Sequence, residues 1–199
     1  SEERIKDILE ENAKLKNDLK KNTAENSYDN INKLGKPIPN QLDIVNYVEI
    51  QKHHHIDISE IALRLHLLTN MMYSAMYIIS GVTKCSVMAT LVYNGQQYTI
   101  AGHGNCELPI LNVKHAICPC NTIPGNIMVV DNVKKSNFIE AANGGMHYYI
   151  GGRFTCVPEI SLCYLAFEPI DPSMFFNMEQ YMRDKFPQFD SALNTFISS

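Results

Sequence analysis

The sequence contains no tryptophan, no long apolar run and no excess of basic residues. A membrane-spanning helix needs about 20 consecutive apolar residues, and no stretch of this chain approaches that length. The 17 basic residues are outnumbered by 21 acidic ones, which gives a formal net charge of −4. Nucleic-acid binding needs a basic surface instead. We therefore expect no membrane span and no nucleic-acid partner.

The fingerprints of several enzyme classes are also missing from the sequence. The chain has no P-loop, no glycine-rich dinucleotide motif and no G-x-S-x-G nucleophile motif. No secretory signal is visible, so we expect a cytoplasmic protein. The 199 residues, of which 45% are hydrophobic, suffice for one globular domain with an appendage.

Most of the six cysteines occupy apolar, strand-like surroundings, such as S-L-C-Y-L around Cys163. In a chain without a secretory signal, buried and reduced thiols are the expectation. The six are Cys85, Cys106, Cys118, Cys120, Cys156 and Cys163.

The first 25 residues have the pattern of a coiled-coil stem. Apolar residues and asparagines recur at alternating steps of three and four, which is a heptad seam. The a positions are Ile5, Asn12 and Leu19, and the d positions are Ile8, Leu15 and Asn22. An asparagine at an a position fixes register in two-stranded coils, so the seam predicts a homodimer. The alternative is a single solvated helix.

Residues 26–56 have a linker composition, in which 41–50 could be a short helix or a strand. A domain is predicted over 57–199. Asp57 and Glu60 form a capping box for a helix whose apolar face ends near Gly81. A strand over 86–93, an Asn94-Gly95 type I′ turn and a partner strand over 97–101 follow.

The segment from Ala116 to Pro172 carries the most specific pattern. A β-rich stretch ends at Asp131, and a short helix follows near Phe138. An aromatic pair at Tyr148 and Tyr149 opens a last hairpin, which turns at Pro158-Glu159, and a closing helix starts at Asp171 or Ser173. The fold class is therefore α/β (α+β), with a central antiparallel sheet, packed helices and the N-terminal coiled-coil helix.

This order of elements resembles a GAF domain, a small-molecule-binding and dimerising sensor module of phosphodiesterases, phytochromes and bacterial signalling proteins. The resemblance covers roughly Asp57 to Phe186 and implies that the Ala116–Pro172 segment builds a pocket wall. The candidate pocket residues are Cys118, Asn121, Thr122, Asp131, Phe138, Tyr148 and Tyr149. The alternative is a filled core, with Tyr149 packing rather than binding.

Other chemistries have weaker support. GAF-fold free methionine sulfoxide reductases use cysteines, and Cys118, Cys120 and Cys106 offer thiols, but the loop from Asn132 to Glu140 has none. Zinc sites favour C-x₂₋₄-C rather than C-x-C spacing, and the His53-His54-His55 triplet lacks further ligands. We expect no metal and no cofactor.

The sequence therefore predicts a non-enzymatic dimeric signalling or scaffold module. Its GAF-like domain would bind a protein partner or sense a small molecule. A thiol-dependent reductase of the free methionine sulfoxide reductase type is the alternative.

Overall fold

The computed structural model describes residues 2–22, 38, 41, 58–80, 85–104 and 108–198, and the side chains of all these except 15–22 and 79–80. The described chain combines helices with one six-stranded antiparallel sheet. The elements are α1 (Glu2–Asn22), α4 (Ile58–Ser80), β1 (Cys85–Tyr93), β2 (Gln96–His103), β3 (Leu111–Asn112), the 3₁₀ turn η3 (Pro119–Asn121), β4 (Ile127–Val130), the 3₁₀ turn η4 (Val133–Lys135), α5 (Ile139–Asn143), β5 (Tyr148–Arg153), β6 (Ile160–Ala166) and α6 (Pro172–Ser198). Asp57 and most of the predicted linker lie outside the described residues.

The strands run in the order β3-β2-β1-β6-β5-β4, and every neighbouring pair is antiparallel. The predicted first hairpin is confirmed as β1 and β2. Its turn residues have positive φ, 50° at Asn94 and 76° at Gly95, as a type I′ turn requires. The last hairpin is also confirmed, as β5 and β6.

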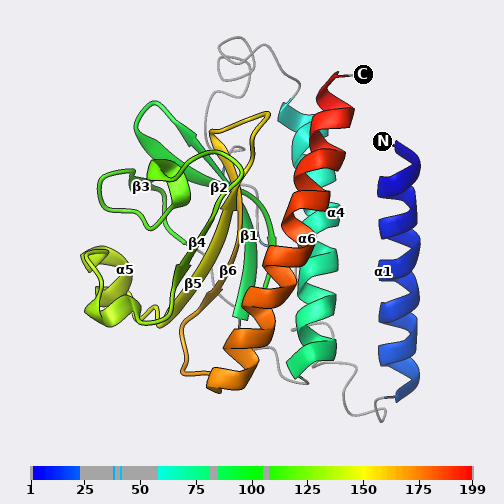
Figure 1. Cartoon of the computed structure of the whole chain (residues 1–199), viewed down its shortest axis with the longest axis horizontal. Helices are drawn as coiled ribbons and strands as arrows, with labels where there is room; N and C mark the ends of the chain where they lie inside the picture. The colour runs from blue at the N-terminus through cyan, green and yellow to red at the C-terminus, as the bar shows by residue number, and fades with distance from the viewer. Residues whose placement is uncertain are drawn as a thin grey trace.

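Helices α4 and α6 cover one face of the sheet, which we call the helix face (Figure 1). The predicted apolar side of α4 is confirmed, because its core residues are at most 2% exposed. These are Ile61, Leu65, Leu68, Met72 and Met76. The closing helix starts at Pro172, inside the predicted window, and runs unbroken through Pro187 to Ser198. Among the described helices, none combines the length and apolarity that crossing a membrane requires.

Two adjacent glycines of β5 let aromatic rings approach the sheet from opposite faces. A Cβ on Gly152 would lie 2.6 Å from the ring of Phe186 of α6, and one on Gly151 would lie 2.4 Å from the Tyr149 hydroxyl. Because both distances are far below a van der Waals contact, only glycine fits at either position.

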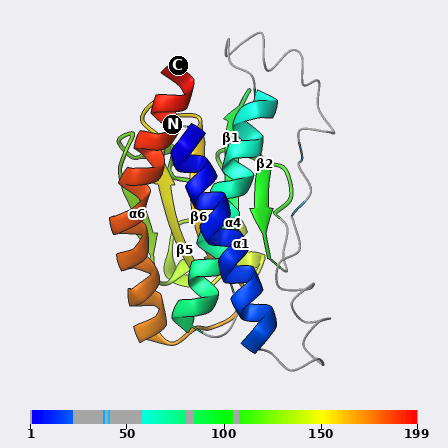
Figure 2. The same ribbon diagram turned by 90° about the vertical axis from the view of Figure 1, so that its right-hand side faces the viewer.

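Helix α1 packs on the outer surface of α4 and α6, so that three layers follow one another: sheet, helix pair and α1 (Figures 1 and 2). Ile5 and Ile8 are buried there. The buried Asn12 accepts a hydrogen bond from the Ser74 hydroxyl of α4 at 2.6 Å. At one end, Arg64 of α4 pairs with Glu2 at 3.4 Å.

The heptad seam thus has a partner within its own chain. Ile5, Ile8 and Asn12, which the pattern assigned to a two-stranded interface, are buried against α4 and α6. The side chains of Leu15 and Leu19 lie outside the described residues. A seam that repeats every three and four residues fits any apolar helical surface, whether it belongs to another chain or to the same one. A dimer through this seam would require α1 to leave α4.

A double-mutant cycle on Asn12→Ala and Ser74→Ala tests the packing of α1. Because the two side chains share a buried hydrogen bond, we expect a coupling energy of about 1 kcal/mol in the free energy of unfolding. Chemical denaturation of the four proteins measures it. If Asn12 instead faces Asn12 of a second chain across a dimer, the effects of Asn12→Ala and Ser74→Ala on the free energy of unfolding will be additive. Sedimentation will then show that removal of residues 1–25 lowers the mass to that of a monomer.

Candidate functional site

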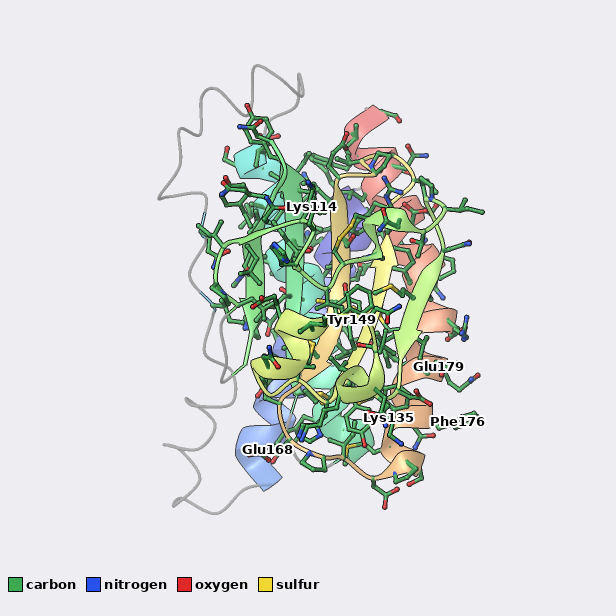
Figure 3. The ribbon with its side chains drawn as sticks, turned by 90° about the vertical axis from the view of Figure 1, so that its left-hand side faces the viewer. Lys114, Lys135, Tyr149, Glu168, Phe176 and Glu179 are labelled. Atoms are coloured by element: carbon green, nitrogen blue, oxygen red, sulfur yellow. A yellow bond between two sulfur atoms is a disulfide. The ribbon has the colours of Figure 1, made fainter. Side chains whose placement is uncertain are left out.

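The second face of the sheet, which we call the far face, is covered in the described part of the chain by residues between β2 and β5 and by Ile38, whose N–H donates to the carbonyl oxygen of Gly102 at 2.9 Å. This covering contains η3, η4 and the short α5, and it has no helix as long as those on the helix face. Figure 3 views this face. A smaller core lies beneath the covering, formed by Ile38, Met88, Ile117, Val133, Met146, Tyr149, Cys163 and Leu165.

A cavity of about 400 Å³ lies between the far face and this covering. Its walls are mostly apolar, and its volume falls in the range of small-molecule sites. The lining residues are Gln97, Leu108, Pro109, Leu111, Ala116, Ile117, Glu140, Ala141, Asn143, Gly144, Met146 and Phe167. The walls therefore come from β2, from the chain around β3 and η3, from α5 with the turn that follows it, and from Phe167 directly after β6.

Gln97 is the buried polar group of this cavity. Tyr98 and Ile100 of β2 point into the core on the helix face, so the alternation of the strand turns Gln97 to the far face. Its side-chain Nε2 donates to the carbonyl oxygen of Ile117 at 3.3 Å, and this bond fixes which way the amide points. Gln97 is 5% exposed, and its Oε1 is buried without a hydrogen-bond partner. Such an acceptor costs about 1–3 kcal/mol relative to a paired one.

The charge of the cavity comes from α5. Glu140 and Asn143 are exposed residues of that helix, and Glu140 is the one charged residue among the described lining residues. The described part of the lining contains no lysine or arginine. A carboxylate near an apolar site favours neutral or cationic molecules over anionic ones.

Beside the cavity, Cys118 and Cys120 form a disulfide, with their Cα atoms 5.3 Å apart. The prediction that all cysteines are reduced is therefore wrong for this pair. The extended conformation of Cys118 followed by the η3 turn brings the two side chains together, which spacing alone does not reveal. A loop this short contributes only about 1.6 kcal/mol in the chain-entropy account of disulfide stability.

The other described cysteines are thiols rather than disulfide partners. Cys85 and Cys163 are buried, as predicted, and Cys156 is half-buried. Burial raises the pKa of the Cys156 thiol, and the nearby Asp190 carboxylate raises it further. Cys106 lies outside the described residues.

None of the seven residues predicted for the pocket lines this cavity. Asp131, directly after β4, is exposed, and Phe138 is half-buried at the start of α5. Exposed Asn121 ends η3, and the Thr122 hydroxyl donates to the carbonyl oxygen of Pro119 at 2.6 Å. Cys118 is buried in the disulfide.

The two tyrosines of β5 lie on opposite faces. Tyr148 packs against Phe175 of α6, with ring centroids 5.0 Å apart, and so belongs to the helix face. Tyr149 fills the far-face core and is 1% exposed (Figure 3). Burial raises the pKa of Tyr149 well above its usual value, and Cys163 beside it adds to the shift.

Metal-binding candidates do not converge within the described part of the chain. His103 is buried on the helix face, with its ring 4.7 Å from that of His66, whereas His115 is exposed after β3. No three His, Cys, Asp or Glu residues among those described are placed to hold one ion. His53, His54 and His55 lie outside the described residues.

Truncation of Tyr149 tests whether its site is a packed core. Tyr149→Ala should cost about 3–5 kcal/mol of unfolding free energy, because a fully buried aromatic ring is lost. Tyr149→Phe is the matched control and should cost about 1 kcal/mol, since only the hydroxyl is removed. Denaturant titration measures both. A loss below 1 kcal/mol for Tyr149→Ala would show that the ring projects into open space.

No protein-family model matches this chain, and comparison with curated proteins finds no significant match. The chemistry of the cavity and of the adjacent disulfide must therefore carry any statement about function.

Proposed function

We propose that this chain is a non-enzymatic sensor module whose far-face cavity binds a small neutral or cationic molecule. One observation carries the proposal. The buried Oε1 of Gln97 has no partner and belongs to a residue that lines a cavity of about 400 Å³. A ligand N–H or O–H group that donates to this oxygen recovers the free energy that the unpaired acceptor costs.

The remaining lining narrows the class of ligand. Leu108, Leu111, Ile117, Met146 and Phe167 provide apolar contacts for a hydrocarbon or aromatic body. The carboxylate of Glu140 favours a cationic or hydrogen-bond-donating group at the α5 side and disfavours phosphates and carboxylates. The proposed ligand is thus a compact, largely apolar molecule with at least one donor, of the size of a metabolite.

The GAF resemblance supports the same site. The described elements follow the expected order: long helix, hairpin, intervening segment, strand, short helix, hairpin and closing helix. The resemblance assigns the pocket wall to the Ala116–Pro172 segment, and most of the cavity lining comes from that segment. Membership of the GAF family is part of this proposal.

Small-molecule sensing has better support than the other predicted roles. A dimeric scaffold rests on the heptad seam, and three of its residues are already buried within one chain. A thiol reductase of the expected type would need a cysteine between Asn132 and Glu140, where the sequence has none. Homodimerisation, a protein partner and a cytoplasmic location stay predictions. The cytoplasmic location was expected together with reduced cysteines, so the disulfide removes part of its basis.

Melting of wild type and Gln97→Met with a library of matched compounds tests the proposal. The compounds come in pairs that differ at one position. One member carries an N–H or O–H donor there, and the other carries the methylated form of that group. We expect donor compounds to raise the Tm of the wild type more than their methylated partners. In Gln97→Met the difference should vanish, because the acceptor is gone while side-chain length is kept. One lost buried hydrogen bond corresponds to an affinity loss of about tenfold to a hundredfold.

Gln96→Met is the control, since Gln96 precedes Gln97 on β2 but is exposed. It should keep the full difference between the compounds of a pair. Equal shifts in wild type and Gln97→Met for every binding compound would contradict the role assigned to Gln97.

A further inference from the structure

The Cys118–Cys120 disulfide joins two residues that are separated only by Pro119. The stabilisation that a disulfide provides falls as the loop it closes shortens. This bond therefore contributes little to the stability of the fold. A disulfide that contributes little to the fold can be opened and closed without unfolding the protein.

The two cysteines differ in their exposure to solvent. Cys118 is 4% exposed, whereas Cys120 is only partly buried. Thiol–disulfide exchange requires an incoming thiolate to reach one sulfur along the S–S bond, and the accessible sulfur is the one attacked. The geometry therefore makes Cys120 the electrophile and Cys118 the leaving group.

The backbone N–H of Cys120 is placed to stabilise the Cys118 thiolate as the leaving group. The N–H of Cys120 points at the Sγ atom of Cys118, 3.4 Å away. A hydrogen bond donated to a thiolate is stronger than one donated to a neutral sulfur. This contact therefore favours departure of the Cys118 thiolate when the bond opens.

The segment 117–122, which contains the disulfide, is held at both ends by hydrogen bonds that do not involve the two sulfurs. The carbonyl oxygen of Ile117 accepts from Nε2 of Gln97 at 3.3 Å. The carbonyl oxygen of Thr122 accepts from Nη1 of Arg153 at 2.7 Å. Because these anchors remain after reduction, the two thiols stay close together and can form the bond again.

We propose that Cys118 and Cys120 form a reversible thiol–disulfide exchange site for low-molecular-weight thiols of the glutathione class. A thiolate RS⁻ attacks Sγ of Cys120, which gives the mixed disulfide Cys120–S–SR and the Cys118 thiolate. A second RS⁻ attacks the R-bound sulfur, which releases RSSR and the Cys120 thiolate, and both protein thiolates take protons from water. In sum, two RSH are oxidised to RSSR while the protein disulfide is reduced to two thiols. This activity does not depend on whether the cavity binds a ligand.

Equilibration of the folded full chain with glutathione redox buffers tests the proposal. Acid quenching, alkylation and peptide mapping then assign the state of each cysteine separately. We expect the Cys118–Cys120 bond to open and close reversibly with the ratio of reduced to oxidised glutathione, while circular dichroism stays that of the folded protein. A bond that stays closed at every ratio until the protein unfolds would overturn the proposal.

Two single variants test which sulfur is attacked. With oxidised glutathione, Cys118→Ser should form a mixed disulfide at Cys120, whereas Cys120→Ser should leave the buried Cys118 about tenfold or more slower to react. The buried Cys163 serves as the internal control for unfolding and should stay unmodified in both. Equal rates at the two positions, in variants that melt as the wild type does, would overturn the assignment of Cys120 as the reactive sulfur.

Discussion

The structure depends on the need to bury both faces of one antiparallel sheet. Strand β1 at its centre is apolar on both sides: Val87 and Ala89 face the helices, Met88 faces the other way, and all three are fully buried. Neither face can be left in water, because each Å² of exposed apolar surface costs roughly 25 cal/mol. Helices α4 and α6 supply a continuous cover on one side. On the other side, the described cover comes from the chain between β2 and β5, together with Ile38.

That second cover explains where the cavity lies. The connecting chain also has to add β3 and β4 to opposite edges of the sheet, so it crosses the far face in short pieces. Tyr149, Met88 and Cys163 fill the space over β1, β6 and β5, but the pieces leave a gap near β2. Gln97 lies at this gap and holds the crossing chain through the carbonyl oxygen of Ile117.

Local patterns in the sequence predicted much of the scaffold but little of the site. The α4 face, the Asn94-Gly95 turn and the Pro172 helix start depend on neighbouring residues, so the sequence reveals them. The partner of α1 depends on which apolar surface is nearest, and a heptad seam is the same for either choice. The sequence did not indicate Gln97, because glutamine in a strand usually faces solvent and its burial depends on tertiary packing.

The cavity lining and the disulfide are adjacent in the chain. Ala116 and Ile117 line the cavity, and the disulfide begins at the next residue, Cys118. Gln97, which lines the cavity, donates to Ile117 through Nε2 while its Oε1 stays unpaired. A ligand that donates to Oε1 polarises this amide and strengthens its bond to Ile117, since linked hydrogen bonds reinforce one another. In the two proposals, the ligand site and the exchange site therefore lie on either side of one hydrogen bond, between Gln97 and Ile117.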